Sequence, residues 1–342
     1  MNIVVNHSYG FWSCCSVRLY RIIEFINNKN TLPENVDSSS QFSWYKINNS
    51  DDITYDYFQH YNNINININY KYPINYNWDH QFNNYSKLEY NKICPIVEKY
   101  FSPSSEIKQI INDIELKYYI NYNLKKNNIN TKIRLNYNIN NEDKLNNYEE
   151  KLNNYEEKMS NYEEKLNNYE EKMSNYEEKL NNYEEKLNNY EEKLNNYEEK
   201  LNNYNNICVL FYRGNDKNTE TKICGYNEYI EKANIILNEN PNIQFLIQSD
   251  ETEFIEQMTL LYPNNSFYFK DEIRHIKKCN STVDIVMKDK NNLFSKYYLA
   301  ITIIMSKCNY IVCGSGNCSI WIMLYRGNSR NVYQNLNGEW IK

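Results

Sequence analysis

At residues 207–217 the chain reads ICVLFYRGNDK, in which six apolar or aromatic residues lead directly into a polar, glycine-containing segment. A continuous apolar run of this length predicts a strand at 207–212 that is buried on both faces. Such a strand belongs to an α/β fold with a parallel sheet covered by helices, if strands and helices alternate further along the chain. They do: strands are predicted at 243–248, 266–270 and 310–313, and helices at 226–240, 252–262, 293–305 and 318–325.

The loop after the first strand has the residues of a phosphate site. Ligands of parallel sheets bind at the carboxyl ends of the strands. Here Arg213 offers a planar, permanently charged fork, Gly214 permits close approach of a backbone, and Asp216 can fix the arginine or the loop. A surface turn with an ordinary salt bridge would use the same residues, and position alone does not separate the two interpretations.

Two more polar loops follow later strands of the predicted sheet. Ser249 and Asp250 end the second strand, where the carboxylate can hold a ribose or base, although Ser-Asp before a helix is also the pattern of a simple N-cap. The third loop places glycines at a helix N-terminus, where amides and the helix dipole attract an anion; its residues are Gly314, Ser315, Gly316 and Asn317. Together the three loops predict one pocket for a nucleotide or nucleotide sugar.

In order and spacing, three segments resemble the motifs of the fucosyltransferases that include the core α-1,6 and nodulation enzymes. The segments are VLFYRGNDK at 209–217, QFLIQSDE at 244–251 and IMSKCNYIVCGSGN at 304–317. The resemblance covers about residues 207–326, and the N-terminal half matches only in its strand-loop-helix opening. It implies a GT-B-like pair of Rossmann-type domains that transfers fucose from GDP-fucose with inversion and needs neither a metal nor a cofactor.

The roles of individual residues follow from this resemblance. Arg213 matches the arginine that holds the donor β-phosphate, and Asp216 and Lys217 match the Asp-Lys pair behind it. Asp250 matches the acid that binds the nucleoside, and residues 314–317 match the last loop on the phosphate side.

The sequence departs from the family at three positions. Residues 211–214 read FYRG where the family has His-x-Arg-Arg, so a second arginine is missing, and an apolar residue near Ile301 replaces an acid that would recognise guanine. The acid downstream of the Asp-Lys pair is Glu220, one position out of register. Because an inverting transfer needs a group that takes the acceptor proton, Glu220 is the predicted base, acting directly or through Lys217. Other acid or base groups, for which structural roles are the simpler interpretation, are His7, Asp37, His60 and His80.

The opening of the chain also has an α/β pattern. It predicts a strand at 3–6, a loop at 8–13 and a helix at 17–27. Further on, Ile64, Ile66 and Ile68 alternate with Asn, which indicates either a strand or a polar loop.

A seven-residue repeat divides the chain. From Leu145 to Tyr204 the unit LNNYEEK recurs with Leu or Met at heptad position a and Tyr at d, which predicts a helix that buries its apolar stripe against a second copy. Glu at e and Lys at g favour parallel pairing. An isolated helix, or a repeat produced by replication slippage, is the alternative. The predicted parts are an N-terminal α/β domain on the acceptor side, a helical repeat and a C-terminal nucleotide-sugar domain, at 1–140, 141–205 and 206–342.

Composition argues against several classes of protein. The formal net charge is −6, and because the repeat holds 16 Glu and 8 Lys, the rest of the chain carries +2, which disfavours a nucleic-acid binder or a polybasic membrane-surface protein. The longest apolar run, 297–305, has nine residues where a membrane span needs about 20, and no signal peptide is expected. None of the nine cysteines forms a Cys-x-x-Cys pair, which predicts a reducing, cytoplasmic location and no metal site.

The sequence therefore predicts a glycosyltransferase, most simply a fucosyltransferase. It would move a sugar from a nucleotide diphosphate to a hydroxyl of a glycan or protein, and would self-associate through residues 145–204. The alternative is a structural scaffold that oligomerises through the repeat and carries an inactive, transferase-like fold.

Overall fold

The computed structural model describes residues 2–48, 51–59, 64–73, 78–123, 204–270 and 275–342. Residues 1–126 and 203–342 belong to one compact unit. Apart from Tyr204, the seven-residue repeat lies outside the described residues, so the coiled coil and the boundary near residue 140 stay predictions.

A six-stranded sheet forms the centre of the C-terminal part. Its strands, in sequence order, are β3 (Ile207–Tyr212), β4 (Gln244–Ser249), β5 (Ser266–Phe267), β6 (Tyr310–Gly314), β7 (Val332–Leu336) and β8 (Glu339–Ile341). Across the sheet the order is β5-β4-β3-β6-β7-β8, and all neighbours run parallel except β8, which is antiparallel to β7. The predicted α/β fold with a mainly parallel sheet is confirmed, although β5 ends earlier than expected and β7 and β8 were not predicted.

Helices cover both faces of this sheet. They are α6 (Tyr226–Glu239) and α7 (Thr252–Leu261) on one face, and α9 (Asn291–Lys307) and α10 (Asn317–Arg326) on the other. Val209 and Leu210, adjacent in β3, belong to the two opposite apolar clusters, as a strand buried on both faces requires. All four helices were predicted to within two residues of their ends; the short α8 (Val283–Val286) was not.

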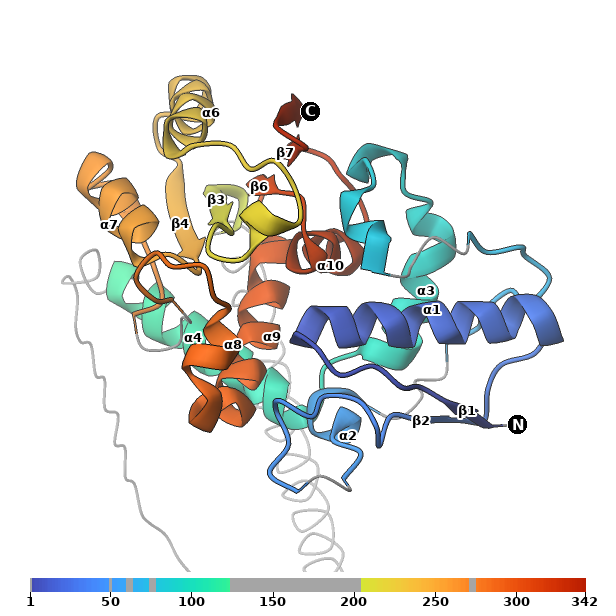
Figure 1. Ribbon diagram of the computed structural model, residues 1–342. Helices are drawn as coiled ribbons and strands as arrows, with labels where there is room; N and C mark the ends of the chain where they lie inside the picture. Colours follow the sequence, from blue (N-terminus) through green and yellow to red (C-terminus); the bar gives the residue numbers. More distant parts are fainter. Residues whose placement is uncertain (1, 49–50, 60–63, 74–77, 124–203, 271–274) are drawn as a thin grey trace, which may run out of the picture. The chain divides into compact units, whose positions relative to one another are not determined.

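The described N-terminal residues add a small parallel sheet and several helices that pack on the C-terminal part. The elements are β1 (Asn2–Val4), α1 (Phe11–Lys29), β2 (Asn35–Asp37), α2 (Thr54–Tyr57), α3 (Tyr90–Phe101) and α4 (Ser105–Asn123). Helices α1 and α3 contact α10, and α4 contacts α9 (Figure 1). Trp12 of α1 stacks on Trp321 of α10 with 5.3 Å between the ring centroids. Both ends of the sequence therefore share one continuous apolar core.

The start of α1 corrects one prediction. The helix begins at Phe11, so the predicted loop at 8–13 is helical in its second half. Phe11 and Trp12 are both buried, and the helix can bury them only if its apolar side begins there, directly after Gly10. Residues 64–68 form no strand, which leaves the polar loop of the two alternatives.

The pair of Rossmann-type domains stays a prediction. The described N-terminal residues contribute two strands of three residues each, and their helices pack against α9 and α10. No helix within the described ranges combines the length and the apolar character that crossing a bilayer would need.

Candidate functional site

A cleft of about 470 Å³ lies beside the carboxyl ends of β3 and β6. The predicted site residues that line it are Arg213, Asp216, Lys217, Glu220, Gly316 and Asn317. The other lining residues come from the C-terminal part, including Asp284 and Tyr298, and from the N-terminal part, chiefly His7, Tyr9, Trp12, Ser13, Trp44 and Gln81. The cleft therefore combines residues from both halves of the sequence.

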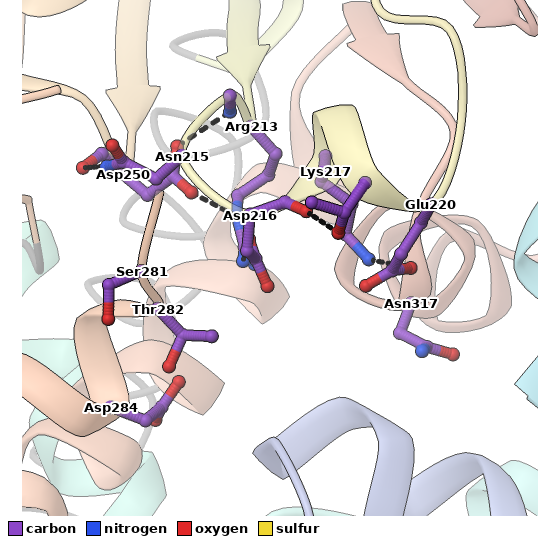
Figure 2. A network of polar contacts seen from close by, with 12 residues as sticks. Arg213, Asn215, Asp216, Lys217, Glu220, Asp250, Ser281, Thr282, Asp284 and Asn317 are labelled. Atoms are coloured by element: carbon purple, nitrogen blue, oxygen red, sulfur yellow. Dashed lines mark hydrogen bonds and ion pairs between the residues drawn. The ribbon is translucent and has the colours of Figure 1, made fainter. Parts of the chain in front are cut away.

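Arg213 is held at the cleft by three partners, of which Figure 2 shows Asp216 and Asp250. Its Nε donates to Asp250 Oδ2 at 2.9 Å and its Nη2 to Asp216 Oδ1 at 3.0 Å. Its Nη1 donates to the hydroxyl of Tyr298 at 3.0 Å. Burial alone would lower the pKa of Arg213, but Tyr298 and Asp250 raise it well above its ordinary value. Burial alone would raise the pKa of Asp216, yet the charges of Arg213 and Lys217 outweigh it and hold that pKa below its ordinary value.

Asp250 fixes the loop that carries Arg213. Its Oδ1 accepts from the Gly214 amide at 2.9 Å, and its backbone carbonyl accepts from Asn215 Nδ2 at 2.7 Å. With Oδ2 bonded to Arg213, both carboxylate oxygens are used inside the protein. The neighbouring Ser249 Oγ accepts from the Glu251 amide at 2.9 Å, and the N-cap residue of α7 is Glu251. Ser249 and Asp250 therefore stabilise the turns at the ends of β3 and β4.

Gly214 is required by close packing. A Cβ atom at this position would lie 2.1 Å from Glu251 Oε1 and 2.5 Å from Tyr212 Cε1, and neither distance is compatible with a real side chain. Glu251 is fully buried, its Oε2 accepts from the Tyr226 hydroxyl, and burial raises its pKa. Packing inside the protein therefore requires a glycine at position 214, independently of any ligand in the cleft.

Lys217 and Glu220 form an ion pair in the wall of the cleft. Lys217 begins a short 3₁₀ segment, and Glu220 directly follows that segment. Side chains three residues apart in such a turn point in the same direction. Lys217 Nζ donates to Glu220 Oε2 at 2.6 Å and to Gln81 Oε1 at 3.2 Å. The Lys217 side chain is 8% exposed and the Glu220 side chain 32% exposed. The carboxylate is therefore the partner that a ligand in the cleft can reach.

The loop after β6 has its amides occupied. The amide of Ser315 donates to the carbonyl of Asn335 at 2.8 Å, and that of Gly316 donates to the hydroxyl of Tyr85 at 3.2 Å. The amide of Asn317 donates to Gln81 Oε1 at 3.1 Å. An anion can bond these three groups only by displacing their acceptors. Gly314 belongs to β6, whereas Gly316 and the Asn317 side chain remain at the cleft.

His80 lies behind Asn317. Its Nε2 is 3.3 Å from Asn317 Oδ1 and 2.5 Å from Ser16 Oγ, which also accepts from Trp321 Nε1 at 3.0 Å. Burial lowers the pKa of His80 to about 3, so the ring is neutral at pH 7. His80 therefore has a structural role in orienting Asn317.

The other N-terminal acid and base candidates differ in position. His7 lines the cleft, with Nε2 2.8 Å from Ser13 Oγ, and burial lowers its pKa. Asp37 accepts from the Ser39 amide at 2.8 Å, which is a local turn bond. His60 lies outside the described residues.

A second, narrower cavity of about 40 Å³ adjoins Arg213 and is lined in part by Ser249, Asp250 and Ile301. This is where the family resemblance puts the nucleoside. An engineered apolar cavity of about 150 Å³ binds benzene, so the present cavity is smaller than one that holds a single aromatic ring.

Sequence reasoning missed several residues of the cleft, namely Tyr9, Trp44, Gln81, Asp284 and Tyr298. Tyr9 lies in a polar, glycine-containing segment after a predicted strand, the same signal that identified Arg213, and it could have been found in that way. The other four lie in segments without any such pattern.

Comparisons with protein-family models, with curated proteins and with solved structures found no match for this chain. Within the described ranges, no three His, Cys, Asp or Glu side chains gather in a group that could hold a metal ion.

Proposed function

We propose that this protein is a GT-B-like glycosyltransferase that transfers a sugar, with GDP-fucose as the first donor to test, to a hydroxyl acceptor. The observation that carries the proposal is the cleft in which Arg213 and Lys217 lie beside the partly exposed carboxylate of Glu220. An inverting transfer requires cationic groups for the departing diphosphate and one base for the acceptor proton. The first segment that resembles the fucosyltransferases supplies Arg213 and Lys217, whereas Glu220 lies downstream of it, one position out of register with the family's acid.

The reaction would use these groups as follows. The acceptor oxygen bonds to C1 of the sugar while the bond from C1 to the diphosphate oxygen breaks, and the acceptor proton goes to Glu220. Arg213 and Lys217 stabilise the negative charge of the leaving diphosphate.

The ion pair between Lys217 and Glu220 suggests how donor binding would prepare the base. Without a ligand, the ammonium is bonded to the carboxylate at 2.6 Å. A diphosphate in the cleft competes for that ammonium, and the carboxylate is then available for the acceptor hydroxyl. Donor binding would thus precede proton removal.

One observation favours the alternative, an oligomerising scaffold with an inactive fold. The amides of Ser315, Gly316 and Asn317 are bonded within the protein, and Arg213 and Lys217 are both paired with carboxylates. Little uncompensated positive charge is left for a diphosphate. A scaffold needs no nucleotide, so donor binding separates the two functions.

The test is a thermal-shift series with GDP, UDP, ADP, CDP and GDP-fucose on the full chain. A ligand that binds only the folded state at 100 times its Kd stabilises it by about 2.7 kcal/mol, which is a rise in Tm of several degrees. We expect such a rise with GDP and GDP-fucose. No rise with any of the five ligands would reject the transferase and favour the scaffold.

Arg213→Ala then tests the residue assignment. Loss of a charge-assisted phosphate contact should weaken nucleotide binding by about 1.5 to 3 kcal/mol, or roughly 10- to 150-fold in Kd. Arg330→Ala is the matched control, because Arg330 is exposed and precedes β7, at the amino ends of the parallel strands, whereas Arg213 follows the carboxyl end of β3. Equal affinities in the two variants would remove Arg213 from the site.

A further inference from the structure

Two aromatic side chains line the cleft on its N-terminal side. Tyr9 is 60% exposed, Trp44 is half-buried, and their ring centroids lie 6.2 Å apart at an angle of 71°. The ring of Tyr9 also contacts the ring of His7, with 4.9 Å between centroids. Tyr9 lies outside the apolar core, and Trp44 packs against the core with only part of its surface. The parts of both rings that line the cleft beside Glu220 therefore need another explanation.

The loops that carry these two rings are fixed to each other and to the C-terminal part. The amide of Ser43 donates to Ser8 Oγ at 3.0 Å, and the amide of Phe11 donates to the hydroxyl of Tyr45 at 2.6 Å. The Tyr45 hydroxyl in turn donates to Asp284 Oδ1 at 2.7 Å. The two loops that carry the aromatic rings are therefore held in place by hydrogen bonds to each other and to the C-terminal part.

The backbone conformation of Phe42 also affects the position of Trp44. Phe42 has a φ of 60°, which bulky residues rarely adopt. Its ring is fully buried and lies 5.5 Å from the ring of Phe11 and 6.1 Å from that of Tyr57. Strained backbone held by its surroundings is concentrated at ligand-binding sites. Phe42 precedes Trp44 by two residues, so the packing of Phe42 helps to set where Trp44 lies.

We propose that Tyr9 and Trp44 form a stacking platform for a sugar ring of the acceptor, so that the acceptor is a carbohydrate. A pyranose presents C–H groups on one face, which pack against the negative faces of aromatic rings, and hydroxyl groups at its edge. The inference rests on the proposed transfer reaction, whose base, Glu220, lines the same cleft.

The polar groups beside the platform suit hydroxyl groups. His7 and Ser13 are bonded to each other at 2.8 Å and can each bond a sugar hydroxyl. The described N-terminal residues that line the cleft carry no permanent charge. A neutral acceptor rich in hydroxyls matches this wall better than a peptide, which would need a row of free backbone groups to pair with.

The test measures sugar and nucleotide binding on the same samples of the full chain. The sugar probes are the methyl glycosides of glucose, galactose, mannose, fucose and N-acetylglucosamine, followed by saturation-transfer NMR, and the nucleotide probe is the thermal shift by GDP. Tyr9→Ala and Trp44→Ala should each weaken binding of the best glycoside at least tenfold and leave the GDP shift unchanged. Trp44→Phe should retain most of the sugar binding, and Tyr70→Ala, which removes an exposed tyrosine elsewhere, should retain all of it.

The outcomes separate this inference from the proposed function. Sugar binding that both alanine variants retain overturns the platform, and so does a GDP shift accompanied by binding of a Ser/Thr peptide and of none of the glycosides. Sugar binding that depends on Trp44 without any nucleotide shift supports the platform and overturns the transferase. Because Tyr9 is exposed, Tyr9→Ala keeps the test valid even where Trp44→Ala fails to fold.

Discussion

Lowering the pH from 7 to 5 should destabilise this protein through His80. Burial puts the pKa of the folded imidazole at about 3, against an ordinary value of 6.5 in the unfolded chain. Between these values the unfolded state binds a proton that the folded state excludes, so the contribution to stability is complete above pH 6.5 and is lost as the pH falls below it. From pH 7 to pH 5 this loss amounts to about 2 kcal/mol.

The assay is urea unfolding of the wild type and of His80→Gln at pH 7, 6 and 5. Glutamine keeps an N–H donor for Ser16 Oγ, which His80 Nε2 contacts at 2.5 Å, but it does not titrate. The wild type should therefore lose about 2 kcal/mol more than the variant. The difference cancels groups present in both proteins, including Glu251, whose raised pKa acts in the opposite direction. Equal losses in the two proteins would refute the argument, because they would mean that His80 gains its proton in the folded state without penalty.

Three further predictions concern the site and the repeat. Glu220→Gln should lower the rate of sugar transfer about 100-fold or more while GDP still raises Tm, because only proton removal is impaired. Equal transfer rates in the variant and the wild type would exclude Glu220 as the base. Gly214→Ala should destabilise the fold by about 1 to 3 kcal/mol or more, since its Cβ would lie 2.1 Å from Glu251 Oε1, and an unchanged urea midpoint would contradict that packing. Deleting residues 145–204 should turn a self-associated chain into a monomer in sedimentation, because it removes the predicted a/d stripe; a full chain that is already monomeric would contradict the coiled coil.

The central strands and their helices could be predicted because buried parallel strands have continuous apolar runs in the sequence. The last parallel strand, β7, breaks that rule. Its Gln334 and Asn335 are 2% and 3% exposed, and Gln334 Nε2 donates to Ser315 Oγ at 2.8 Å. Buried polar residues with partners elsewhere in the chain hide a strand from a search for apolar runs, so this edge of the sheet was missed.

The candidate site was predictable only where it is local in sequence. Arg213 and Glu220 lie within one loop, and their types and spacing indicated their chemistry. In the loop at 314–317, the amides of Gly316 and Asn317 would otherwise be available to an anion. They donate instead to Tyr85 and Gln81, which lie more than 200 residues away in the sequence. Such long-range hydrogen bonds leave no local pattern. Of the two aromatic residues in the wall of the cleft, Tyr9 follows a predicted strand and could have been found, whereas Trp44 lies in a segment without such a pattern.

The core shared by the two ends of the chain is completed late in translation. About 300 residues separate Trp12 from Trp321, on which it stacks, so at 5 to 20 residues per second the ribosome takes about 15 to 60 s to pass from one to the other. During that time the apolar side of α1 lacks its α10 partner and is a binding surface for chaperones that recognise exposed apolar segments. Each unit of the seven-residue repeat lengthens the interval by about 0.4 to 1.4 s. The repeat, residues 145–204, therefore accounts for about a fifth of the time that the first helix of the nascent chain waits for its α10 partner.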